Sequence, residues 1–384
     1  MIRAPVNPAL LTWSRERAGL TREDLVRRFP RLSEWEAGAR LPTFRQADDF
    51  ASRVHVPFGY LFLSEPPIEK IPFPDYRTIA GTRVANPSPD LLDVIRDCLD
   101  RQSWYRNYAR MDEQEALSFV ASASRVDSPV QVASQMRDLL GFGVDARRSS
   151  ASWEESFRMF RNALDGIGVL VMVSGIVASN TNRRLKPKEF RGFALSDPLA
   201  PLVFVNGADS KAAQMFTLAH ELAHVWLGSS ALSDCEATPP TGLRSDEVWC
   251  NAVAAEFLVP LVVLQDEVRD SESFHNALQR LSRTFKVSRL VILRRLLDVD
   301  WLSRAEFELA WEEEIKSLRS LAKSGGEGGN FYRTTLTRVG NRFAKALVVS
   351  TLEGQTLYRD AYRMLGIRRG SSFDELARQI TSVS

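Results

Sequence analysis

The stretch at residues 216–224 reads FTLAHELAH and places two histidines four residues apart. On an α-helix, positions i and i+4 lie one above the other, so the imidazoles of His220 and His224 can reach one ion. Glu221 lies on a neighbouring part of the same face, where it can take a proton from a water molecule. This H-E-x-x-H motif predicts a metal site with two histidine ligands and a glutamate base.

The residues around the motif predict a buried helix. It begins near Asp209, carries apolar side chains through Trp226 and ends at Gly228. The chain has only four histidines, and the other two, His55 and His275, have no metal-ligand spacing to any residue. The alternative interpretation is a helix with two structural histidines.

A third ligand is needed, because zinc hydrolases use three protein ligands and leave one position open. No third histidine follows at the spacing of the extended motif, so a carboxylate from a later helix is expected. Glu247 is the best candidate, and Asn251, one turn further on, is expected to hydrogen-bond a ligand. The weaker alternatives are Asp234, Glu236, Asp246, Cys250 and Glu256. The expected ion is Zn2+, with Mn2+ as the alternative.

The composition is that of an ordinary globular protein. Of the 384 residues, 44% are hydrophobic and 26% are charged, which excludes wholesale disorder and collagen-like repeats. Fifty basic residues against 48 acidic ones give a net charge of +2, so any nucleic-acid-binding patch must be local. The three scattered cysteines predict no disulfide framework. The longest uncharged apolar stretch, residues 166–178, is shorter than the about 20 residues of a membrane span. We therefore expect a cytoplasmic protein without a membrane segment.

The pattern along the chain predicts a mostly helical α+β fold, with a small sheet and the motif helix flanked by all-α modules. The predicted divisions are a helix-turn-helix-like domain at 1–65, a Pro-rich linker at 66–87, a helical domain at 88–148, a zinc metallopeptidase domain with trailing helices at 149–323, a Gly-rich linker at 324–330 and a basic helical module at 331–384.

Four segments in order resemble the ImmA/IrrE metallopeptidase family: residues 191–195, 201–206, 216–224 and 247–260. The resemblance covers about residues 150–303. It implies a gluzincin-like fold in which His220, His224 and Glu247 are ligands and Glu221 is the catalytic base. It also implies site-specific cleavage of a transcriptional repressor, often of phage-repressor type, which induces stress-response or mobile-element genes.

Two segments near the motif are candidates for substrate binding. An extended substrate is expected to pair with an exposed strand edge, either 191–195 or 202–205, which makes Phe193, Ala194 and Leu195 the candidate contacts. The basic run at 183–191 is expected to be a solvated loop. A functional alternative is that it holds an acidic segment of the substrate.

The N-terminal segment resembles the helix-turn-helix of phage-repressor-like (Xre-type) regulators. The resemblance rests on residues 15–21 and 35–43, but the interval from Thr21 to Glu36 is shorter than the usual pattern at the reading helix. Such domains place that helix in the major groove. Two interpretations stay open: DNA binding, or docking of a partner repressor. A second helix-turn-helix pattern at 278–297 is more typical of the helical half of a protease lobe.

The leading functional hypothesis is a zinc-dependent endopeptidase whose protein substrate is a phage-repressor-like transcription factor. The main alternative is a DNA-binding transcription regulator with a metal-sensing or non-catalytic motif. A third hypothesis is an interaction scaffold that gathers partners through its helical block and basic tail.

Overall fold

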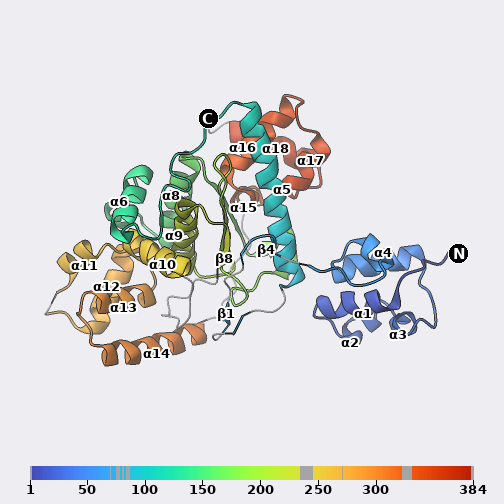
Figure 1. Cartoon of the computed structure of the whole chain (residues 1–384), viewed down its shortest axis with the longest axis horizontal. Coiled ribbons are helices and arrows are strands. Elements are labelled where there is room, and N and C mark those ends of the chain that lie inside the picture. Colours follow the sequence, from blue (N-terminus) through green and yellow to red (C-terminus); the bar gives the residue numbers. More distant parts are fainter. Residues whose placement is uncertain are drawn as a thin grey trace. The chain divides into compact units, whose positions relative to one another are not determined.

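The structure is a computed structural model, and it describes residues 2–69, 71–74, 78–79, 82–83, 87–233, 245–269, 271–321 and 331–381. The chain divides into two compact units (Figure 1). The first unit comprises residues 1–72 and 85–95, and the second comprises residues 73–84 and 96–384. The division of the chain into the smaller modules expected from the sequence stays a prediction.

The first unit is a bundle of short helices, as the sequence predicted. Its elements are α1 (Pro8–Arg17), α2 (Arg22–Val26), α3 (Leu32–Glu36), α4 (Phe44–Val54) and the 3-10 helix η1 (Phe58–Phe62). Thr21 and Thr43 begin α2 and α4 with capping boxes, in which each hydroxyl accepts a hydrogen bond from a backbone N–H of the first turn. The helices enclose a core that includes Leu11, Trp35 and Phe50.

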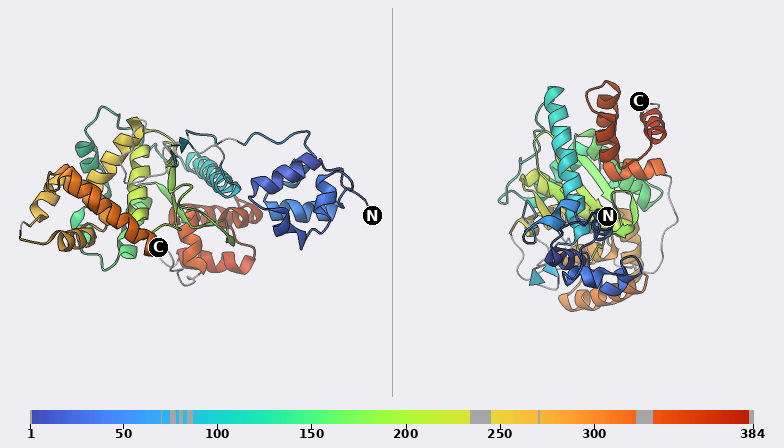
Figure 2. Two further views of the ribbon diagram at one scale, coloured as in Figure 1. Left: turned by 90° about the horizontal axis from the view of Figure 1, so that it is seen from below. Right: turned by 90° about the vertical axis from the view of Figure 1, so that its right-hand side faces the viewer.

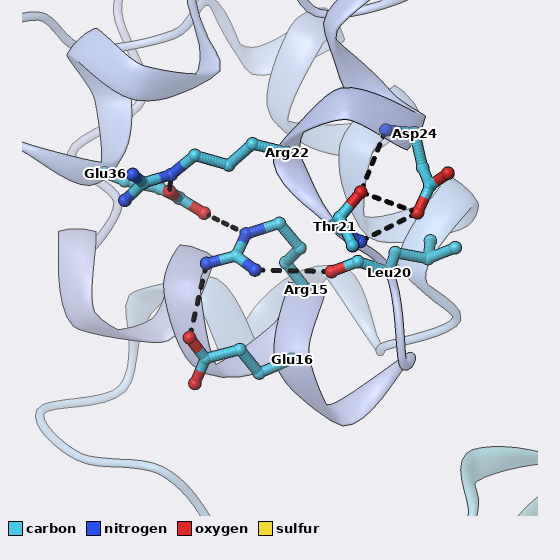
Figure 3. Close-up of polar contacts among 7 residues, drawn as sticks. All are labelled: Arg15, Glu16, Leu20, Thr21, Arg22, Asp24 and Glu36. Atoms are coloured by element: carbon cyan, nitrogen blue, oxygen red, sulfur yellow. Dashed lines mark hydrogen bonds and ion pairs between the residues drawn. The ribbon is translucent and has the colours of Figure 1, made fainter.

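A buried carboxylate joins the first three helices of this unit (Figure 3). The side chain of Glu36 is only 1% exposed, and it accepts hydrogen bonds from Arg15 Nε at 2.7 Å and Arg22 Nε at 2.6 Å. Arg15 also donates to the carbonyl oxygen of Leu20 at 3.2 Å. These two arginines therefore hold α1, α2 and α3 together. The helix that corresponds to a reading helix, α3, has only five residues.

The second unit is built on a four-stranded mixed sheet with strand order β3-β7-β6-β8. The strands are β3 (Leu170–Ser174), β7 (Leu202–Asn206), β6 (Gly192–Leu195) and β8 (Ala231–Ser233). β3 and β7 are parallel, and β6 runs antiparallel to both β7 and β8. Two short hairpins lie outside this sheet: β1 (Thr78–Ile79) with β2 (Thr82–Arg83), and β4 (Ile176–Val177) with β5 (Asn180–Arg184). The fold is α+β and mostly helical, as predicted.

Helices cover both faces of the sheet (Figures 1 and 2). On one side lie α8 (Trp153–Gly166), α9 (Lys211–Leu227) and α10 (Ser245–Leu258). On the other side lie residues 96–111 of α5 (Pro89–Met111), α15 (Phe331–Val339) and α16 (Asn341–Leu352). Both α15 and α16 pack against β3, and the C-terminal helices belong to the same compact unit as the sheet.

The remaining helices surround this framework. They are α6 (Pro129–Leu140), α7 (Val144–Arg148), α11 (Leu261–Glu267), α12 (Phe274–Phe285), α13 (Arg289–Asp298), α14 (Arg304–Leu321), α17 (Tyr358–Leu365) and α18 (Gly370–Thr381). The second helix-turn-helix pattern of the sequence is α12–α13, whose apolar side chains share one core with α9 and α10. That packing agrees with its assignment to the lobe around the motif helix.

One loop prediction was wrong. Arg183 and Arg184 of the basic run lie in β5, which pairs with β4, because the chain turns back on itself at residues 178–179 and forms a hairpin. No single helix in the described parts of the chain is long and apolar enough to cross a membrane, although the bent pair α10–α11 meets the requirement by length and composition.

Candidate metal centre

The motif lies on α9, whose limits follow from its end residues. Ser210 accepts a hydrogen bond from the backbone N–H of Ala213 and begins the helix, and Gly228 ends it in the left-handed conformation, with φ of 73°. All residues of α9 from Gln214 to Trp226 are buried, as is usual for a helix that is covered on all sides. His220, Glu221 and His224 are each 0% exposed.

Glu247 on α10 faces the two histidines. Its carboxylate oxygens lie 3.2 Å from His220 Nε2 and 3.0 Å from His224 Nε2, and the two Nε2 atoms lie 3.1 Å apart. Ligands of a tetrahedral zinc ion at about 2.0–2.1 Å lie about 3.3 Å from one another. The three side chains therefore fit a zinc ion by donor type and by spacing, and they can hold a metal ion with a fourth position left for another ligand.

The other ring nitrogens of both histidines have hydrogen-bond partners. His220 Nδ1 lies 2.9 Å from Asn251 Oδ1, and His224 Nδ1 lies 2.9 Å from Ser229 Oγ. With Nδ1 as the donor, each ring presents Nε2 as a lone pair to the centre of the group. Asn251 was predicted for this role. Ser229 was missed, and the available signal was its position as the first hydroxyl after the helix end at Gly228.

Electrostatics favour an ionised Glu247. Burial raises the pKa of this carboxyl group, but the adjacent His220 and His224 lower it by more, and the net pKa lies well below its usual range. Burial lowers the pKa of His224, which favours the neutral ring that a metal needs, whereas the adjacent Glu247 carboxylate outweighs burial at His220 and raises its pKa. An anionic carboxylate with imidazole nitrogens is the donor set of many catalytic zinc sites.

Glu221 lies on α9 where strand β6 comes close to the helix. A Cβ atom on Gly192 of β6 would lie 2.6 Å from Thr217 Cγ2, 2.8 Å from the carbonyl oxygen of Phe204 and 3.1 Å from Glu221 Cγ. Only glycine therefore fits at this point of β6. The close contact places Glu221 between the strand and the helix, on the turn of α9 that also carries His220.

The structure favours Glu247 over the other described candidates for the third ligand. Glu256 is buried against Arg295 in an ion pair, and Asp246 lies 3.3 Å from Arg125. Burial raises the pKa of the Cys250 thiol well above its ordinary value, so this side chain packs as a neutral group. The remaining two candidates for the third ligand, Asp234 and Glu236, lie outside the described residues.

The expected strand edge was wrong. β6 pairs with β7 on one side and with β8 on the other, and β7 lies between β3 and β6, so neither strand is an edge. Side chains alternate along a strand, and Gly192 and Ala194 face α9, so Phe193 and Leu195 face the opposite side of the sheet. The Phe193 ring stacks on Phe204, with ring centroids 5.0 Å apart.

Arg147 on α7 is a further residue that sequence reasoning missed. Its side chain is fully buried, and its Nη1 donates to the carbonyl oxygens of Leu258 at 2.6 Å and Phe285 at 2.7 Å. Burial lowers the pKa of this guanidinium group to about 9. Because Leu258 and Phe285 are the last residues of α10 and α12, Arg147 anchors the C-terminal end of the helix that carries Glu247.

Comparison with known proteins gives two matches to family models. Residues 165–297 match the IrrE N-terminal-like domain of the M78 peptidases, a range that contains the sheet, α9 and α10. Residues 339–379, which comprise most of the C-terminal helices, match a domain of unknown function (DUF8813). No curated protein and no solved structure matches the chain. Residues 165–297 are thus similar to a metallopeptidase domain of the IrrE type, and they contain a buried His-His-Glu group that can bind a metal ion.

Proposed function

We propose that this protein is a zinc-dependent, site-specific endopeptidase whose metal ligands are His220, His224 and Glu247. The observation that carries the proposal is the convergence of these three side chains, within 4.8 Å of one another and buried, beside a carboxylate on the same helix. A buried structural ion pair needs only one histidine and one glutamate. Two Nε2 atoms that converge on one carboxylate, with both Nδ1 atoms held, are the arrangement that a metal ion requires.

Each residue of the site has a separate role in the proposed hydrolysis of a peptide bond. When bound, zinc supplies a Lewis acid that polarises the scissile carbonyl and lowers the pKa of water. Glu221 takes the proton from the attacking water and then gives it to the leaving amine. Asn251 and Ser229 hold the two imidazoles by their Nδ1 atoms. The buried setting of these groups strengthens each of these interactions relative to water.

We further propose that the substrate is a transcriptional repressor of phage-repressor type, and that its cleavage induces stress-response or mobile-element genes. The family match at residues 165–297 supports a peptidase role. In this proposal the N-terminal bundle docks the repressor. In this bundle Arg15 and Arg22 are paired to Glu36, and α3 is about 7.5 Å long by helix geometry. Both features favour docking of a partner over the reading of bases.

Cleavage of candidate repressors by the purified, zinc-loaded chain tests this proposal. The wild type is expected to give one defined cut, read by intact-mass spectrometry. Glu221→Gln is expected to keep zinc and lose the cut, whereas Glu308→Gln, an exposed carboxylate on α14, keeps both. A Glu221→Gln protein that cuts at the wild-type rate contradicts the assigned base. Specific, salt-dependent operator binding with no cleavage of any repressor favours the alternative of a DNA-binding regulator.

A further inference from the structure

Among the described strands, β8 is the edge of the sheet that lies beside the metal centre. The other edge strand, β3, packs against α15 and α16, and Gly340 comes so close that an added Cβ would lie 2.8 Å from the carbonyl oxygen of Val171. β8 begins two residues after Ser229, whose hydroxyl holds His224. Its last residue, Ser233, pairs with Gly192, where an added Cβ would lie 3.1 Å from Glu221 Cγ. The strand therefore runs past the metal centre from the His224 end to the Glu221 end.

The outer side of β8 already has an occupant from the same compact unit. The backbone N–H of Leu232 donates a hydrogen bond of 3.1 Å to the carbonyl oxygen of Pro74. The ring of Phe73 packs on the ring of Phe193, with centroids 5.9 Å apart and an angle of 36°. These two contacts are those that an extended peptide makes when it adds to a strand edge, one from the backbone and one from a side chain.

The segment Phe73–Pro74 makes few contacts with the outer side of β8 among the residues that the structure describes. Pro72 and Pro74 flank Phe73 and are both exposed. Proline has no backbone N–H, so neither residue can donate a second bond to β8 and extend the ladder. Among the residues that the structure describes, Phe73–Pro74 is held on β8 by one backbone hydrogen bond and one aromatic contact. An ordinary peptide can form several backbone hydrogen bonds along the same edge.

We propose that the outer edge of β8 is the peptide-binding edge of the metal centre, and that Phe73–Pro74 is an internal occupant that the substrate displaces. The ligand is an extended peptide with a large aromatic side chain, which takes the place of Phe73 against Phe193. The part that concerns the substrate rests on the proposed peptidase function. The occupancy of the edge by Phe73–Pro74 does not.

Peptide binding by the zinc-loaded full chain tests this inference in the Glu221→Gln background, where no cleavage interferes. The probe is the fluorescein-labelled peptide GSTVFVTSG, and GSTVAVTSG is its partner without the aromatic ring. Phe73→Asp is expected to lower the Kd for the first peptide about tenfold, since it removes the contact that the peptide must displace. Phe44→Asp, which alters a partly exposed phenylalanine of the N-terminal unit, is the matched control and is expected to leave the Kd unchanged.

Hydrogen exchange of the Leu232 amide gives a readout that does not depend on binding strength or cleavage. Phe73→Asp is expected to speed this exchange, and saturating GSTVFVTSG is expected to slow it again. Phe73→Ala serves the same purpose if the aspartate variant does not hold zinc. Equal peptide affinity with and without Phe73, or a Leu232 amide that is unaffected by either change, overturns the inference. A chain that binds the peptide as expected but never cuts a protein refutes the proposed function and leaves the assignment of this edge intact.

Discussion

Replacement of Asn251 by alanine removes the hydrogen bond that holds the ring of His220. Asn251 Oδ1 lies 2.9 Å from His220 Nδ1, and the histidine is completely buried, so its ring depends on this partner for its orientation. Loss of such a partner of a metal-binding histidine lowers metal affinity about 10- to 100-fold, or roughly 1.4–2.7 kcal/mol. We expect the zinc affinity of Asn251→Ala to fall within this range, because the ring is then free to turn Nε2 away from the ion.

A competition titration against a chromophoric zinc chelator measures this affinity. Asn251→Asp is expected to restore most of it, because the carboxylate keeps an acceptor at the same place. Val248→Ala, an exposed site on the same helix, controls for general effects on α10. Thermal unfolding of the metal-free proteins checks that each variant folds. A folded Asn251→Ala protein that holds zinc within twofold of the wild type refutes the role assigned to this residue.

Three further substitutions test the framework of the site. Arg147→Met removes hydrogen bonds from the ends of α10 and α12, and chemical denaturation is expected to show that the free energy of unfolding falls by about 3–5 kcal/mol. The control is Arg148→Met at the neighbouring, half-exposed arginine, which is expected to change it by less than about 1 kcal/mol. Equal losses in the two variants contradict the role of Arg147 as an anchor. Gly192→Ala forces β6 away from α9 and is expected to cost about 1–3 kcal/mol, against less than about 1 kcal/mol for Gly59→Ala, where a Cβ meets open space. Burial raises the pKa of Asp165 from 3.8 to about 6, against the opposing charge of Arg161, so the folded state binds the extra proton and loses about 3 kcal/mol of stability as the pH rises between these values. Asp165→Asn is expected to remove this pH dependence. If the stability of the variant changes with pH between 4 and 6 as that of the wild type does, Asp165 is not its source.

The helical part of the site could be predicted because its signals are local. The spacing of His220 and His224 defines a helix face, Gly228 marks the end of the helix, and Asn251 follows Glu247 by one turn. Each of these inferences needs only the geometry of one helix. The sequence alone left several carboxylates open as third ligand, because the packing of α10 against α9 is a tertiary contact that no local sequence pattern reveals.

Apart from the basic run in the local β4–β5 hairpin, the features that the sequence did not predict are contacts between distant segments. β6 was expected to be an edge, but the three-residue strand β8 covers it, and so short a strand has no periodicity from which it can be recognised. The role of Arg147 depends on carbonyl oxygens more than 100 positions along the chain. The packing of the C-terminal helices on β3 likewise joins segments that no local pattern connects.

Zinc content and affinity of the wild type beside Glu247→Ala test the central claim most directly, with Asp246→Ala as the control from the preceding residue. We expect one tightly bound zinc ion per chain in the wild type and in Asp246→Ala, and a loss of tight binding in Glu247→Ala. A purified chain that neither holds nor accepts zinc, or a Glu247→Ala protein that binds it as tightly as the wild type, would contradict the assignment of His220, His224 and Glu247 as a metal centre.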